Sequence, residues 1–154
     1  MKALLDSSVL VAAHLPAHPE HVASSDWLRQ ATQGNYELVV AAHSLAEVYA
    51  VLTRLPLRPR ISPKAAHQFL DQNVLRKGSV VALSPDEYRA VIDDAVREGW
   101  AGGIIYDALI AKAADGARVD HLITLNVAHF QRVWPAGGAR VAAPQTISAP
   151  TAVP

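Results

Sequence analysis

The stretch Lys2-Ala3-Leu4-Leu5-Asp6-Ser7-Ser8-Val9-Leu10 places a carboxylate at the point where a short apolar run gives way to a polar break. The apolar run resumes at Val9–Ala13, which predicts a buried strand followed at once by a helix. Asp6 would then lie at the carboxyl end of the strand, where open α/β sheets bind their ligands. The same residue can instead cap the helix, because its side chain can accept hydrogen bonds from free backbone N–H groups.

The length and composition predict one compact domain. The chain has 154 residues, of which 51% are hydrophobic and 18% are charged, which is enough apolar material for one sizeable core. We expect this domain to span residues 1–143. Residues 144–154 consist largely of Pro, Ala, Ser and Thr with little to bury, so we expect a flexible C-terminal tail there.

The charge balance excludes a general attraction to nucleic acid. With 14 basic and 14 acidic side chains the formal net charge is zero, so any nucleic-acid binding must come from a local patch. The sequence has no cysteine, which excludes disulfides and thiolate metal sites and suits a reducing compartment. It also has no signal-peptide pattern and no apolar run near the ~18 residues of a membrane span. We therefore expect a cytoplasmic protein without membrane contact.

Strand and helix patterns alternate along the rest of the chain. After the first strand, apolar runs of strand length are expected at 36–42, 79–83, 121–125 and 139–143. Helical patterns lie between them, at 9–15, 20–33, 43–55, 63–74, 85–98, 104–114 and 127–132. This alternation predicts right-handed crossovers and an α/β fold, with a mostly parallel sheet covered by helices on both faces.

Glu47 follows the second predicted strand, in the first turn of the next helix. Ser44 and Glu47 match the capping box S-x-x-E, which would give Glu47 a structural role without any chemistry. Ser84 and Glu87 repeat the same pattern at another helix start. Because the pattern occurs twice, it cannot by itself assign a catalytic role to Glu47.

Asp107 lies in the nearly all-apolar segment Ile104–Ala114, which predicts a buried helix. A buried carboxylate is costly unless it is paired, hydrogen-bonded or bound to a metal. The structural alternatives are a favourable contact with the helix dipole or a buried ion pair.

Polar residues at the ends of parallel strands gather at one edge of a sheet. We therefore expect Asp6, Glu47 and Asp107 to converge near Thr124 and Asn126. Three carboxylates at short range raise one another's pKa unless a cation neutralises them. An oxygen-only donor set without His or Cys suits Mg²⁺ or Mn²⁺.

A basic cluster lies in a stretch without any acid, between Glu47 and Asp71. Its members are Arg54, Arg58, Arg60 and Lys64. The cluster can contact RNA phosphates or acidic residues of a partner protein. It can equally be an ordinary solvated loop, because local basic clusters are frequent without function.

Four segments together resemble PIN-domain ribonucleases, and within them the VapC-type toxins of type II toxin–antitoxin pairs. They are LLDSSVL with Asp6, HSLAEVYAVLTRLP with Glu47, GWAGGIIYDALIAKAA with Asp107, and LITLNVAHF with Thr124 and Asn126. The third segment is the most specific, and the resemblance extends to about residue 143. It implies a PIN-like three-layer α/β/α sandwich around a five-stranded, mostly parallel sheet.

The resemblance also implies a function. It implies a Mg²⁺- or Mn²⁺-dependent endoribonuclease that cleaves RNA with a metal-activated water, leaves 5′-phosphate and 3′-hydroxyl ends, and is restrained by a cognate VapB-type antitoxin. A homodimer is expected as well. As a hypothesis, Asp6, Glu47 and Asp107 are catalytic and hold the metal directly or through water, while Ser7 and Thr124 orient these ligands.

The sequence departs from the family pattern at the fourth acidic position. Many relatives have an Asp in the stretch 124–130, where this chain has Asn126 and His129. Asn126 can offer an oxygen to a metal or to its water, but it brings no charge. This favours a single metal, or a second ion recruited only with RNA. We expect His129 at the rim of the site.

Two alternatives belong to other functional classes. A phosphotransfer protein with Asp6 as nucleophile, similar to haloacid-dehalogenase-like phosphatases, needs a second Asp two residues on, where this chain has Ser8. A non-catalytic PIN-like module that pairs with an antitoxin-like partner stays open, because the fourth acid is missing.

Overall fold

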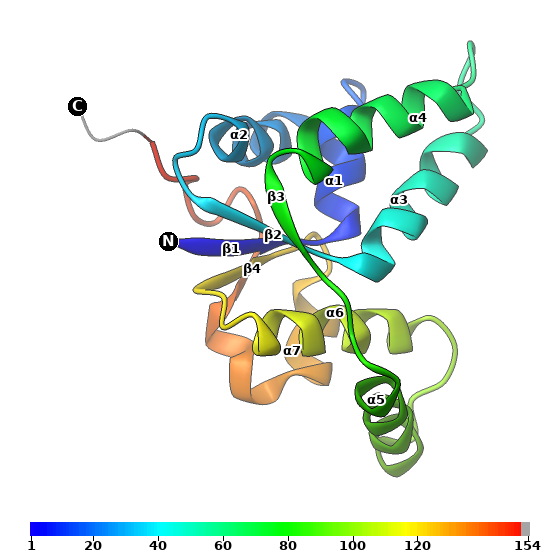
Figure 1. Ribbon diagram of the computed structural model, residues 1–154, viewed down its shortest axis with the longest axis vertical. Coiled ribbons are helices and arrows are strands. Elements are labelled where there is room, and N and C mark those ends of the chain that lie inside the picture. The colour runs from blue at the N-terminus through cyan, green and yellow to red at the C-terminus, as the bar shows by residue number, and fades with distance from the viewer. Residues whose placement is uncertain (152–154) are drawn as a thin grey trace.

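A parallel β-sheet forms the centre of the molecule (Figure 1). The computed structural model describes residues 1–151. Within them, five strands pair in the order β3-β2-β1-β4-β5, and every neighbouring pair is parallel. The strands are β1 (Lys2–Leu5), β2 (Glu37–Ala41), β3 (Gly78–Val81), β4 (His121–Ile123) and β5 (Val141–Ala142).

Helices cover both faces of this sheet, as Figure 1 shows. One layer contains α1 (Ser7–His14), α2 (His21–Thr32), α3 (Ala42–Arg54) and α4 (Pro63–Leu70), which runs on into a π-helical turn, Asp71–Leu75. The other contains α5 (Pro85–Glu98), α6 (Ile104–Gly116) and α7 (Val127–Val133), which a 3₁₀ helix, Pro135–Arg140, links to β5. The predicted α/β fold with three layers is confirmed. None of the described helices is long and apolar enough to span a bilayer.

The strands divide their side chains between two cores. Leu5 and Leu38 pack into the core beneath α1–α4, whereas Leu4 and Val39 pack into the core with α6 and α7. Successive side chains of a strand point to opposite faces, and a sheet covered on both faces is apolar on both. After their first residues, β1 and β2 are therefore apolar, and the polar side chains of the candidate site lie beyond the carboxyl ends of the strands.

The two matching capping-box patterns have different outcomes. At α5 the box is confirmed, because Ser84 Oγ accepts from the Glu87 backbone N–H at 3.3 Å and Glu87 Oε2 accepts from the Ser84 N–H at 2.8 Å. At α3 it is wrong, because the helix begins directly after β2 and its N-cap is Ala41. Ser44 is fully buried, and its Oγ has no hydrogen-bond partner among the described residues. Glu47 is therefore free of the capping role.

This difference predicts unequal effects on stability for the same substitution at the two serines. Ser84→Ala removes a working helix cap and should lower the free energy of unfolding by about 1 kcal/mol. Ser44→Ala removes a buried hydroxyl that makes no hydrogen bond, so it should not lower that free energy. Urea denaturation followed by circular dichroism measures both variants. Equal losses of stability would mean that Ser44 has a partner in solution after all.

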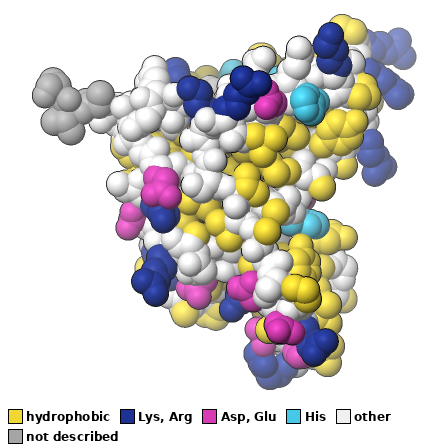
Figure 2. Space-filling view, viewed as in Figure 1, with side chains coloured by type: hydrophobic (Ala, Val, Ile, Leu, Met, Phe, Trp, Pro, Cys, Tyr) yellow, Lys and Arg dark blue, Asp and Glu magenta, His cyan; other side chains and the backbone are white. Residues whose placement is uncertain are grey.

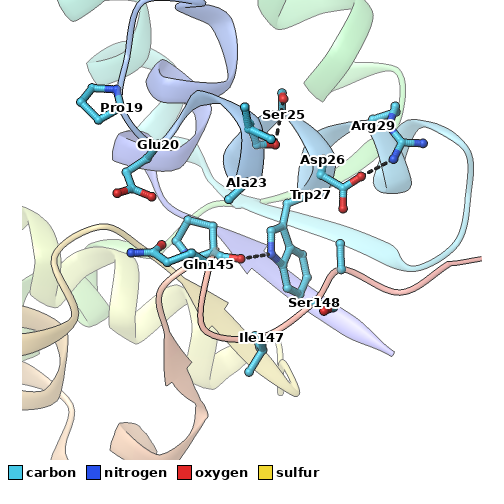
Figure 3. Close-up of a pocket in the computed structure, with 13 residues that line it drawn as sticks. Pro19, Glu20, Ala23, Ser25, Asp26, Trp27, Arg29, Gln145, Ile147 and Ser148 are labelled. Atoms are coloured by element: carbon cyan, nitrogen blue, oxygen red, sulfur yellow. Dashed lines mark hydrogen bonds and ion pairs between the residues drawn. The ribbon is translucent and has the colours of Figure 1, made fainter.

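The segment after β5 packs against α2, although the sequence predicts a flexible tail from residue 144. Trp27 Nε1 donates to the Pro144 carbonyl oxygen at 3.1 Å (Figure 3). Ala149 is buried in the core beneath α1–α4. With α2 the segment lines a cavity of about 780 Å³. The structure thus differs from the expectation as far as Ala149, while residues 152–154 lie outside the described part of the chain.

Candidate active site

Asp6 stands between β1 and α1, and its side chain is buried with only 3% exposed. Its Oδ1 accepts from the backbone N–H of Ser7 at 2.7 Å, so it caps α1. Its Oδ2 accepts from two hydroxyl groups, Ser8 Oγ at 2.6 Å and Thr124 Oγ1 at 2.8 Å. Asp6 therefore combines the cap with a buried, fully oriented carboxylate at the end of the central strand.

The surroundings of Asp6 work against its negative charge. Burial raises the pKa of the Asp6 carboxyl most, and the nearby Glu47 carboxylate raises it further. Hydrogen bonds from Ser8, Thr124 and the Ser7 N–H lower the pKa but do not cancel the rise. An ionised Asp6 is thus disfavoured in the folded chain unless a positive charge approaches it.

Glu47 reaches Asp6 through Ser7. The Ser7 hydroxyl donates to Glu47 Oε2 at 2.6 Å, while the Ser7 N–H donates to Asp6. Because α3 begins at Ala42, Glu47 lies in its second turn, where its side chain is not needed for the free N–H groups of the first. Ser7 therefore binds two carboxylates at once, Asp6 through its backbone N–H and Glu47 through its hydroxyl group.

Asp107 lies in the first turn of α6, with 16% of its side chain exposed. Burial raises the pKa of its carboxyl most, and the charges of Asp6 and Glu47 raise it further. A contact between its Oδ2 and His129 Nδ1, 3.2 Å apart, lowers the pKa in part. Contrary to the expectation of an all-round buried helix, this first turn is partly open, since Tyr106 is 47% exposed.

The residues that follow β4 are linked to Asp6 by hydrogen bonds. Thr124 is fully buried, and its hydroxyl donates to Asp6 Oδ2 and accepts from the Asn126 N–H at 3.0 Å. Ser8 Oγ likewise donates to Asp6 and accepts from the Leu125 N–H at 3.1 Å. These two hydroxyl groups connect the segment after β4 to the Asp6 carboxylate. Asn126 itself is exposed, and no hydrogen bond from its side chain caps α7.

Ser8 and His129 are the contacts that sequence reasoning missed. Ser8 was visible as the second serine of Asp6-Ser7-Ser8, but a serine at a helix start is usually only a cap. His129 was expected merely at the rim, and its side chain is indeed 64% exposed, yet it contacts Asp107. Its position on α7, far from α6 in sequence, gave no signal for that contact.

The three carboxylates are oxygen ligands of the kind that a hard cation prefers, although they are not close enough together to coordinate one ion directly. Within residues 1–151, no three Asp, Glu, His or Cys side chains lie close enough together to hold one metal ion directly. Asp6, Glu47 and Asp107 nevertheless repel one another, as the raised pKa values of Asp6 and Asp107 indicate. Mg²⁺ prefers such oxygen donors and keeps several of its waters, so it can bridge carboxylates that do not touch. The donor set therefore fits the expected metal.

The predicted basic cluster lies apart from the carboxylates. Figure 2 shows Lys and Arg side chains gathered over the outer ends of α3 and α4. Arg54 ends α3, seven residues after Glu47, which corresponds to about 10 Å along the helix. Arg58, Arg60 and Lys64 follow in the exposed connection to α4 and in its first turn. The cluster is thus placed to contact a long ligand that reaches the site, but not the reacting atoms.

Comparisons with known proteins identify the family of this chain. The family model described as PIN domain matches residues 3–133. Ribonuclease VapC40 of Mycobacterium tuberculosis (strain CDC 1551 / Oshkosh) is 36% identical over 112 residues, which are 73% of this chain and 78% of that protein. Ribonuclease VapC27 of Mycobacterium tuberculosis (strain ATCC 25618 / H37Rv) is 31% identical over 116 residues, which are 75% and 79% of the two chains.

A solved structure shows the same fold. VapBC2 from Rickettsia felis, bound to a DNA fragment from their promoter, aligns with a TM-score of 0.63 at 19% identity. The alignment covers 93% of this chain and 98% of that chain. At this identity the likeness concerns the fold, whereas the family rests on the matched domain and on the two ribonucleases. The chain belongs to the PIN-domain family, among its VapC-type ribonucleases.

Proposed function

We propose that this protein is the toxin of a toxin–antitoxin pair, an endoribonuclease that uses Mg²⁺ or Mn²⁺ held by Asp6, Glu47 and Asp107. The observation that supports the metal site is that burial, and the charges of neighbouring carboxylates, raise the pKa of Asp6, which precedes α1, and of Asp107 on α6, with Glu47 on α3 among those neighbours. Such a group is stabilised by a divalent cation and destabilised without one.

Hydrogen bonds within the protein hold the three carboxylates in place. Asp6, Glu47 and Asp107 would hold the divalent ion, which would lower the pKa of an attacking water and neutralise charge on the phosphodiester. Asp6 is held by Ser7, Ser8 and Thr124, so its oxygens are fixed before any ligand arrives. Glu47 is held by Ser7, and Asp107 by His129. Preorganised donors of this kind need no rearrangement during the reaction, which favours hydrolysis.

The expected partner is an antitoxin. The VapBC2 structure from Rickettsia felis contains such a pair together with promoter DNA. By analogy, a VapB-type protein would restrain this chain, and the exposed basic cluster of Arg54, Arg58, Arg60 and Lys64 would contact either its acidic residues or RNA phosphates. We also propose that the protein forms a homodimer. Asn126, exposed and without charge, favours one metal over two.

A cleavage assay with mapped product ends tests this function. The purified chain, incubated with a mixture of transfer and ribosomal RNA, should cleave in Mg²⁺ or Mn²⁺ and stop when a chelator is added. The new ends should carry a 5′-phosphate and a 3′-hydroxyl, because water and not the ribose 2′-hydroxyl is the nucleophile. Cleavage that persists in chelator, or 2′,3′-cyclic phosphate ends, would contradict the metal mechanism. Antitoxin binding without any cleavage would instead favour the non-catalytic module.

A further inference from the structure

A second recess adjoins the carboxylates on the side of α7. It is a cavity of about 470 Å³ between the loop before α6, the first turn of α6, and α7. Asp107 lines it, and so do Trp100, His129 and Arg132. Its volume lies within the range of sites that hold small organic ligands. Because Asp107 belongs both to this cavity and to the carboxylate group, an occupant of the cavity lies directly beside the site of hydrolysis.

Arg132 gives this cavity a free positive charge. It is exposed, and within residues 1–151 its guanidinium has no hydrogen-bond or ion-pair partner. His129 precedes it by three residues on α7, so both side chains lie on the same face of the helix. His129 is engaged with Asp107, which leaves Arg132 as the available cation. A guanidinium in this position suits a phosphate, which it can bind through two parallel hydrogen bonds.

Trp100 gives the cavity an aromatic wall. Its indole packs against a small core of Val91, Ala108 and Leu109, and it also borders the cavity. This packing holds the ring in place before a ligand arrives. A fixed indole is a suitable surface for a nucleobase, because stacking requires only a flat π-face and tolerates any base. One wall of the cavity therefore suits a base, and another suits a phosphate.

We propose that this cavity binds the nucleotide next to the scissile phosphodiester of a single-stranded RNA, with Trp100 stacked on its base and Arg132 on its phosphate. The inference rests on the proposed ribonuclease function and adds to it the form of the substrate. A base can reach Trp100 only when it is unpaired and turned out of a helix. The cavity therefore selects loops and single strands over duplex RNA.

Equilibrium binding in chelator tests the cavity without any cleavage. The probe is a short fluorescein-labelled oligoadenylate RNA, followed by fluorescence anisotropy at several salt concentrations. Arg132→Gln should raise the Kd about tenfold and reduce the slope of log K against log salt by about 0.7, the amount for one phosphate contact on a single strand. Trp100→Leu should raise the Kd by about tenfold through lost stacking. Arg89→Gln, which removes another exposed arginine, on α5 and outside the cavity, should leave both quantities unchanged.

The tryptophans provide an independent readout in the unmodified chain. Trp27 and Trp134 are buried, with 1% and 7% exposed, whereas Trp100 is partly exposed. Unlabelled oligoadenylate should therefore quench the fluorescence of Trp100, and Trp100→Leu should abolish this change. Circular dichroism melting shows whether Trp100→Leu is folded. If Trp100→Leu does not fold, the binding of oligoadenylate by Arg132→Gln, which changes an exposed side chain, tests the cavity instead.

The outcomes separate this inference from the proposed function. If the wild type cleaves RNA, but Arg132→Gln binds the oligoadenylate like Arg89→Gln and the quenching is absent, the cavity is not a nucleotide site. If duplex RNA binds as tightly as the single strand, the stacking role of Trp100 is overturned. If the wild type cleaves no RNA in Mg²⁺ or Mn²⁺, the proposed function fails and the substrate site fails with it.

Discussion

Asp6→Asn is expected to reduce RNA cleavage by roughly a thousandfold or more. The substitution removes one negative charge from the group proposed to hold the metal, and metal-assisted stabilisation of several kcal/mol corresponds to such a factor at about 1.36 kcal/mol per tenfold. Asp107→Asn should have an effect of similar size, because it removes another of the carboxylates proposed to hold the metal. Initial rates at saturating Mn²⁺ measure both variants.

The fold should survive the Asp6 substitution. Asn keeps an oxygen that can accept from the Ser7 N–H, so the cap of α1 is retained. The raised pKa of Asp6 shows that the folded chain favours a neutral side chain at this position, which Asn provides. Thermal melting in chelator should therefore give a Tm close to that of the wild type. A large fall in Tm would mean that lost activity reports unfolding and not chemistry.

Asp115→Asn is the matched control for Asp107→Asn. Asp115 lies at the other end of α6, where its carboxylate faces Arg140 at 3.6 Å and is 56% exposed. The substitution is chemically the same on the same helix, but it leaves the site intact. Cleavage by Asp115→Asn should match that of the wild type. If both variants of α6 lose activity equally, the loss comes from the helix and not from the carboxylate at the site.

Divalent metal is expected to stabilise the wild type and to have no such effect on Asp6→Asn. A ligand at a hundred times its Kd adds about 2.7 kcal/mol to the free energy of unfolding, which is roughly 5–10 °C in Tm for a chain of this size. Mg²⁺ and Mn²⁺ titrations followed by calorimetry measure this without any RNA. An equal rise in Tm for Asp6→Asn would place the metal elsewhere.

The pH dependence of stability should reverse when metal is added. In chelator the raised pKa of Asp107 means that the folded chain binds its proton more tightly than the unfolded chain does. Its contribution therefore favours folding more as the pH falls through the raised pKa, and levels off near the ordinary value of 3.8. In saturating Mg²⁺ the proton competes with the ion, so the same fall in pH should reduce stability.

The difference in free energy of unfolding between the wild type and Asp107→Asn reports the titration of this carboxyl group alone, because the other acids are common to both proteins. In chelator at neutral pH, Asp107→Asn should be the more stable, because it lacks the half-buried charge and its repulsion by Asp6 and Glu47. The gap should narrow as the pH falls, and in Mg²⁺ the wild type should become the more stable. A gap that does not change with pH would show that Asp107 does not titrate in the folded chain with a raised pKa.

Local patterns in the sequence predicted the elements of this fold well. The apolar run at 36–42 becomes β2, Glu37–Ala41, and the segment 104–114 becomes α6, Ile104–Gly116. These elements are visible in sequence because strand and helix periodicities are properties of neighbouring residues. The nearness of Asp6 and Glu47 followed from topology, since β1 and β2 are parallel neighbours that bring their carboxyl ends to one edge. Their role as metal ligands stays a prediction.

The two serine–glutamate pairs show where local patterns fail. Ser44-x-x-Glu47 and Ser84-x-x-Glu87 are alike in sequence, yet only the second forms a capping box. The difference is that β2 runs directly into α3. The helix therefore begins at Ala42, two residues before Ser44. The position of a helix start depends on how the strand before it pairs in the sheet. Neighbouring residues in the sequence do not encode that pairing.

The sequence by itself determined the alternation of strands and helices, the two apolar faces of the sheet and the carboxylates at its edge. The tertiary structure alone decided that Asp6, besides capping α1, accepts a hydrogen bond from Thr124, which lies 118 positions away in the chain. It also decided the contact of His129 with Asp107 and the cavity that Arg132 shares with Trp100. Periodicity is local and can be read along the chain, whereas these contacts join side chains that only the packing of the layers brings together.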